Sequence, residues 1–158
     1  MSTIKVEEIQ HPSNSNNAVS IASDSSVSLK HSASTKLTTT STGVDITGVV
    51  VSGEAVFQKE ITETVFAITD ASSVALDPIN GMIQTWTLGD NRTATDSLTT
   101  GQSMLLIITA SNSNYTLTWP TMKWSGGSAP TLGGANPTAI ELFKVGSQLY
   151  GATVGDLS

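Results

Sequence analysis

Short runs of alternating apolar and polar residues cover most of the chain, and no window repeats apolar residues at helical spacing. Gln84, Trp86 and Leu88 fall on one face of a predicted strand, and the apolar run 104–108 has the length of another. Ser and Thr are abundant and strong helix formers are scarce, which favours strands and turns. The pattern therefore predicts an all-β protein.

The C-terminal part of the chain has strand signals at a spacing typical of two packed sheets. Residues 54–70 read as one or two strands, residues 115–119 as another, and a hairpin is predicted around Gly146-Ser147. We expect residues 54–158 to form an antiparallel β-sandwich or jelly-roll-like head.

Residues 18–53 carry only brief apolar signals, each set among Ser and Thr. These signals are the pairs Val19/Ile21, Val27/Leu29 and Val44/Ile46, and the single Leu37. They predict short, weakly amphipathic strands joined by tight turns.

This N-terminal part has too few apolar side chains to hold itself together. Ordering its backbone costs on the order of 1–2 kcal/mol per residue, and each small apolar side chain returns at most about 1.5–3 kcal/mol on burial. Residues 1–53 are therefore either disordered or ordered by other chains, and the alternating β-branched residues favour an intertwined β-stalk. Ahead of the stalk, Ile4, Val6 and Ile9 mark an extended attachment arm, and we place the domain boundary near Gly53.

The three tryptophans are the largest apolar groups available for a core. Trp86 and Trp119 lie in predicted strands, so we expect them to anchor the core, which should centre on residues 115–132. Trp124 and Tyr150 each adjoin a glycine and a polar turn. They are candidates for core or subunit packing and, alternatively, for a glycan-binding platform.

Composition and charge exclude several kinds of function. The net charge of −6 and the single arginine, Arg92, argue against nucleic-acid binding, which needs a basic surface. The absence of cysteine excludes disulfides and thiolate metal sites. No apolar run approaches the length of a membrane span, and the chain start lacks the pattern of a signal peptide, so we expect synthesis in the cytoplasm and no membrane insertion.

No group of residues predicts catalysis, a metal or a cofactor. His11 and His31, the only histidines, have no neighbouring residues of the types that bind metals. Asp90 and Asp96 flank Arg92, which predicts an exposed ion-pair cluster rather than a glycosidase pair of carboxylates. We expect a protein that is not an enzyme.

Five segments, in this order, resemble parts of phage tail-fibre-like virion proteins of the marine and cyanobacterial type. Residues 1–13 resemble their N-termini, and residues 37–48 resemble the repeat of their trimeric β-shafts. Residues 80–88, 119–132 and 140–155 resemble a small C-terminal domain found in such proteins.

The resemblance implies a homotrimer on the exterior of a phage particle. Its N-terminus would attach to other virion proteins, and its β-domain would project outward to contact host surface glycans. A stalk of about one repeat is equally compatible with a capsid decoration protein that stabilises the shell. A carbohydrate-binding module of another origin is a further alternative.

Overall fold

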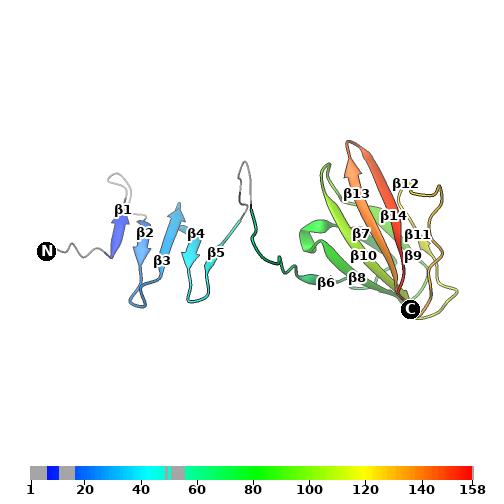
Figure 1. The fold of residues 1–158 in the computed structure, drawn as a ribbon, viewed down its shortest axis with the longest axis horizontal. Coiled ribbons are helices and arrows are strands. Elements are labelled where there is room, and N and C mark those ends of the chain that lie inside the picture. The colour runs from blue at the N-terminus through cyan, green and yellow to red at the C-terminus, as the bar shows by residue number, and fades with distance from the viewer. Residues whose placement is uncertain (1–6, 11–16, 49, 51–55, 158) are drawn as a thin grey trace. The chain divides into compact units, whose positions relative to one another are not determined.

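The computed structural model describes residues 7–10, 17–48, 50 and 56–157. They form an all-β protein, which confirms the fold class predicted from the alternating pattern. The chain divides into two compact units, Met1–Gln58 and Lys59–Ser158, which Figure 1 shows in order along the chain. The predicted boundary at Gly53 lies outside the described residues, and the observed division follows Gln58.

The described part of the N-terminal unit is one antiparallel sheet in which each strand pairs with its neighbours in sequence. Its strands are β1 (Glu8–Gln10), β2 (Asn17–Ile21), β3 (Val27–His31), β4 (Ser34–Thr39) and β5 (Val44–Ile46). Each apolar signal predicted between residues 18 and 53 lies in one of these strands, so the positions of the short strands are confirmed.

The C-terminal unit consists of two sheets. The six-stranded sheet has the order β12-β14-β13-β10-β8-β6, and the three-stranded sheet has the order β11-β9-β7. The strands are β6 (Val65–Ala67), β7 (Ser73–Leu76), β8 (Ile83–Leu88), β9 (Arg92–Asp96), β10 (Ser103–Ala110), β11 (Leu117–Thr118), β12 (Lys123–Trp124), β13 (Thr138–Val145) and β14 (Gln148–Asp156).

Between β6 and β12 the chain passes alternately from one sheet to the other. Consequently β6, β8 and β10 pair in parallel in one sheet, and β7, β9 and β11 pair in parallel in the other. Antiparallel pairing in this unit is confined to β10, β13 and β14. The sandwich-like layering is as expected, but the winding differs from a fully antiparallel jelly roll.

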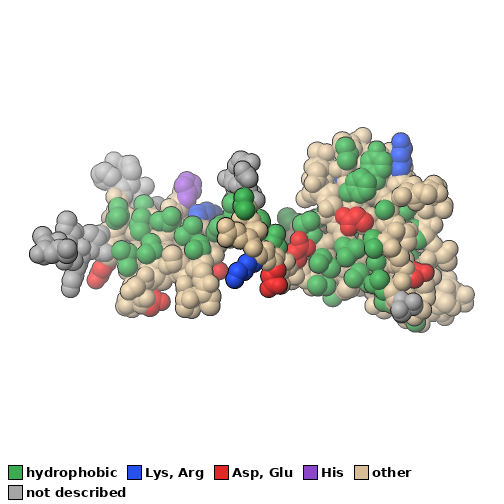
Figure 2. All heavy atoms as spheres, in the orientation of Figure 1, with side chains coloured by type: hydrophobic (Ala, Val, Ile, Leu, Met, Phe, Trp, Pro, Cys, Tyr) green, Lys and Arg blue, Asp and Glu red, His purple; other side chains and the backbone are tan. Residues whose placement is uncertain are grey.

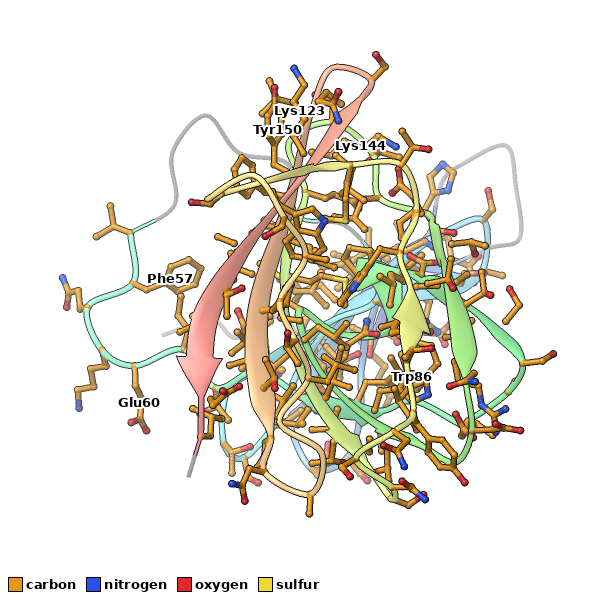
Figure 3. All side chains as sticks on the ribbon, turned by 90° about the vertical axis from the view of Figure 1, so that its right-hand side faces the viewer. Phe57, Glu60, Trp86, Lys123, Lys144 and Tyr150 are labelled. Atoms are coloured by element: carbon orange, nitrogen blue, oxygen red, sulfur yellow. The ribbon has the colours of Figure 1, made fainter. Side chains whose placement is uncertain are left out.

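Trp86 lies between the two sheets of the C-terminal unit, as Figure 3 shows, and is only 1% exposed. Gln84 and Leu88 are buried on the same face of β8, which confirms the predicted alternation. The buried amide of Gln84 donates to the carbonyl oxygens of Asp77 (2.7 Å) and Gly81 (2.8 Å), which fixes the short 3-10 turn Pro78–Asn80 between them.

Trp119 and Trp124 pack against this core but are only partly buried. The core therefore centres on Trp86 and on leucine and isoleucine side chains of β8, β10 and β13, rather than on residues 115–132. Trp119 follows β11 and is not in a strand, so the strand predicted for residues 115–119 was too long. In the same way, the only described strand between residues 56 and 70 is β6.

Candidate functional site

One face of the N-terminal sheet is lined by a continuous row of apolar side chains. Directly paired positions on neighbouring strands share a face of the sheet, and the registers place one apolar residue opposite another on all five strands. This apolar row is Ile9, Val19, Leu29, Leu37 and Ile46. The pair Ile21 and Val27 extends the same face.

The opposite face carries a matching polar row. Its members are Glu8, Ser20, Ser28, Thr38 and Asp45, which are also paired directly from strand to strand. The Ser28 and Thr38 hydroxyl groups lie 3.3 Å apart, within hydrogen-bond distance. The N-terminal sheet is therefore strongly amphipathic across its whole width.

The apolar row keeps much of its surface open to solvent. Ile9 is 54% exposed and Ile46 is 48% exposed. Figure 2 shows hydrophobic side chains following one another across these strands. Of the predicted attachment arm, Ile4 and Val6 lie outside the described residues. Ile9 belongs to β1 and so to the same sheet as the predicted stalk.

The outer face of the six-stranded sheet is a second apolar surface, and Figure 2 shows hydrophobic side chains gathered there around an acidic one. The inward positions of β10 and β13 fill the core, so the alternate positions point outward. The outward apolar side chains include Ile83, Leu105, Ile107, Ala139, Phe143, Tyr150 and Ala152. Phe143 and Tyr150 stack with ring centroids 5.2 Å apart.

Glu141 lies in the middle of this outer face. Its register partners are Leu105 on β10 and Ala152 on β14. Partial burial among these side chains raises the pKa of the Glu141 carboxyl above its ordinary value of 4.5. The sequence interpretation did not single out Glu141 or Phe143, although their alternation with Ile140 and Leu142 could have placed them on the outer face.

The structure does not bring Trp124 and Tyr150 into one platform. Lys123 is the register partner of Tyr150, and Trp124 is the partner of Gly151, so the two aromatic residues occupy neighbouring rows of the sheet. Trp124 packs edge-on against Trp119, with ring centroids 4.9 Å apart. A Cβ at position 151 would lie 2.7 Å from the Trp124 ring, so a glycine is needed for this contact. Tyr150 instead belongs to the outer face, where it stacks on Phe143.

The prediction that Asp90 and Asp96 are the main ion-pair partners of Arg92 is wrong. Arg92 donates to both oxygens of Asp70, a residue between β6 and β7, whereas its Nη1 lies 3.9 Å from the exposed Asp90. Asp70 also accepts from the Trp86 indole N–H (2.9 Å) and from the backbone N–H of Gly89 (3.1 Å). These hydrogen bonds, that from Arg92 above all, lower the pKa of Asp70 to about 2.

Asp96 takes no part in that cluster because it pairs with Lys144. Asp96 is at the far end of β9 from Arg92, and the Lys144 Nζ lies 2.5 Å from its carboxylate. Ile140 and Leu142 are buried on the face of β13 from which Lys144 reaches Asp96, so this ion pair links the two sheets near the ends of β9 and β13. Both ion pairs join elements of the fold, which is a structural role.

The described residues contain no group of three or more His, Asp or Glu side chains that could bind a metal ion. His31 is exposed at the end of β3, and His11 lies outside the described residues. No helix among the described residues has the length and apolarity needed to cross a membrane. Comparisons with protein-family models, curated proteins and solved structures found no match.

Proposed function

We propose that this chain is a non-enzymatic structural protein of a phage particle, resembling a short tail fibre. Three copies assemble through their N-terminal sheets, the N-terminal unit attaches the trimer to other virion proteins, and the C-terminal unit projects outward for adhesion to the host surface. The number of copies and the virion location come from the sequence resemblance. The self-association is supported by the geometry of the N-terminal sheet.

The apolar row is the observation that carries the proposal. A sheet that is apolar on one face is stable only when another layer covers that face. The described N-terminal strands form one layer, in which Ile9, Leu29 and Ile46 are about half exposed. Val19 and Leu37 in the same row are partly buried. Covering each of these side chains is worth on the order of 1 kcal/mol, so a row that crosses five strands supplies a substantial driving force for association.

Identical copies are the partners that fit this face most directly. The row is uncharged, so three copies can face one another around a common axis without bringing like charges together. The polar row, with Glu8 and Asp45 at its two ends, then faces solvent. This arrangement corresponds to the intertwined stalk expected from the sequence, with each copy contributing one sheet.

The mass of the full-length chain in native mass spectrometry tests the proposal. We expect a trimer, and we expect Leu29→Lys to reduce it to monomers because the charge would be buried in the apolar row. Ser28→Lys is the matched control, since it places the same charge on the same strand but in the polar row, and the trimer should persist. A wild-type monomer with a folded N-terminal sheet would contradict the proposal.

A capsid decoration protein is a second candidate function. The whole described N-terminal sheet contains only five short strands, which suits a protein that stands close to a shell as well as a stubby fibre. Cryo-electron microscopy of the particle distinguishes the two: a few trimers at the tail support the fibre, and many trimers across the shell support the decoration protein.

A further inference from the structure

The C-terminal unit has a groove of about 310 Å³ beside β11. One wall is the segment that leads into and out of β11, and the other is part of the loop between β12 and β13. The residues that matter for its chemistry are Ser113, Tyr115, Trp119, Pro130, Thr131 and Leu132. The stretch that carries them, in yellow to light orange, runs along the near side of the ribbon in Figure 3.

The aromatic wall of the groove is held in place by its surroundings. Leu117, between the two aromatic residues, is buried, and β11 pairs with β9. The backbone N–H and the hydroxyl group of Thr116 both donate to the side-chain oxygen of Asn91, at 2.9 and 3.1 Å. Trp119 is further fixed by its edge-on contact with Trp124. A groove whose rings are already positioned loses little conformational entropy when a ligand binds.

Polar groups in the groove retain unused hydrogen-bonding capacity. The Trp119 indole N–H and the hydroxyl groups of Tyr115, Ser113 and Thr131 make no hydrogen bond within the described part of the chain. The polar atoms of Tyr115 and Trp119 are not fully buried there, and Ser113 and Thr131 are exposed residues. The indole N–H of Trp86, by contrast, is already bonded to Asp70. The groove therefore offers neutral donors and acceptors next to two aromatic rings.

No Asp, Glu, Lys, Arg or His is among the described residues that line the groove. A charged ligand would have no partner there and would lose hydration without compensation. A ligand that suits the groove is uncharged, has an apolar face for the rings and carries several hydroxyl groups. A pyranose sugar has these properties, because its C–H face packs on aromatic rings and its hydroxyl groups both donate and accept hydrogen bonds.

We propose that the groove between Tyr115, Trp119 and Thr131 binds a neutral saccharide. Its volume is at the lower end of the range for small-molecule sites, about 300–1,000 Å³, which suits one or two sugar units. The saccharide site adds a ligand class to the adhesion role proposed above, and its biological meaning rests on that role. It is distinct from the platform predicted at Trp124 and Tyr150, which the structure does not assemble.

Saturation-transfer NMR on the full-length chain tests the site, with D-glucose, D-galactose and N-acetyl-D-glucosamine as probes and the charged N-acetylneuraminic acid as a comparison. We expect saturable binding of at least one neutral sugar, with a dissociation constant of about 1 mM per copy. Tyr115→Phe and Thr131→Val each remove one hydroxyl group and should weaken binding roughly 3- to 10-fold. Trp119→Phe retains an apolar ring and should weaken it further.

Thr121→Val is the matched control, since Thr121 is exposed and does not line the groove. Its affinity should equal that of the wild type. The proposal is overturned if no neutral sugar binds at a sugar concentration of roughly ten times the expected dissociation constant. It is also overturned if only N-acetylneuraminic acid binds, or if Tyr115→Phe and Thr131→Val leave the affinity unchanged.

Native mass spectrometry of the same samples distinguishes a failure of the saccharide proposal from a failure of the trimer proposal. A trimer that binds none of the neutral sugars would contradict the saccharide proposal and leave the trimer proposal standing. A monomer that binds a neutral sugar in the groove would contradict the trimer proposal and leave the saccharide proposal standing.

Discussion

A single carboxylate, Asp70, ties together β8, β9 and the turn between them. It accepts hydrogen bonds from Trp86, Gly89 and Arg92, which come from these three parts of the fold. Hydrogen bonds to a charged group are stronger than those between neutral groups. Asp70 therefore fixes the orientation of the central core residue, Trp86, as well as the path of the chain around it.

We expect Asp70→Asn to lower the free energy of unfolding at neutral pH by about 1–2 kcal/mol, because the bonds to Arg92 lose their ionic partner. The folded-state pKa of Asp70 is about 2, below its ordinary 3.8, so its contribution is present above pH 3.8 and is lost as the pH falls toward 2. Urea denaturation of wild type and variant at several pH values measures this difference, which should shrink over that interval.

Asp90→Asn is the control for this experiment. Asp90 lies 3.9 Å from Arg92 and its side chain is 66% exposed, so its removal should change stability little. Equal destabilisation by the two variants would show that Arg92 does not depend on Asp70.

The partner of Arg92 could not be predicted from the sequence because Asp70 is 22 residues away. Asp90 and Asp96 are near in sequence, but Asp90 is exposed and Asp96 faces Lys144. The groove could not be predicted for a similar reason. Tyr115, Trp119, Pro130 and Leu132 all lie in the stretch 115–132 that the sequence analysis emphasised, but the loop path that brings Pro130 and Leu132 to Tyr115 and Trp119 follows no local pattern.

The strands themselves were largely predictable, because alternation with a period of two identifies a half-buried strand directly. Trp86 and its neighbours on β8 and the pairs on β2, β3 and β5 are examples. Parallel and antiparallel strands show the same alternation, so the pairing of β8 with β10 could not be read from it. The burial of Trp119 was overestimated because the size of a side chain does not reveal its depth.

Glu141 on β13 places a carboxylate on the largely apolar outer face of the six-stranded sheet, where the charged form is unfavourable. Burial raises the pKa of Glu141, so the folded state binds its proton more tightly than the unfolded state does. Stability should therefore fall as the pH rises through the carboxyl range. We expect Glu141→Gln to raise the melting temperature at neutral pH and to have no effect well below pH 4.5.

Scanning calorimetry at both pH values measures this effect. Glu60→Gln is the control, because Glu60 is exposed on the extended segment before β6, where Figure 3 labels it. A lower melting temperature for Glu141→Gln at neutral pH would mean that the charged carboxylate is favoured on this face.

The two units of the chain should differ in how their stability depends on concentration. The C-terminal unit has a core of its own, whereas in our proposal other copies cover the apolar row of the N-terminal sheet. In hydrogen exchange, the amides of β3 and β4 should lose protection when the protein is diluted below the assembly range, because binding stabilises only the assembled state. The amides of β10 and β13 should keep theirs.

Protection of β3 and β4 that does not change on dilution would count against self-association through the apolar row. Ser28→Lys should follow the wild-type dilution profile. Leu29→Lys should lack the protection of β3 and β4 at every concentration.

The order of strands in the sheets also has a consequence for the time course of folding. Strands β1 to β5 pair only with the next strand in sequence, and such local contacts form quickly. β10 pairs on one side with β13, for example at Ile107 and Ala139, so a long loop must close first. Docking of the β13–β14 hairpin onto β10 should therefore be the slow step of the C-terminal unit, well after the hairpins of the N-terminal sheet begin to form.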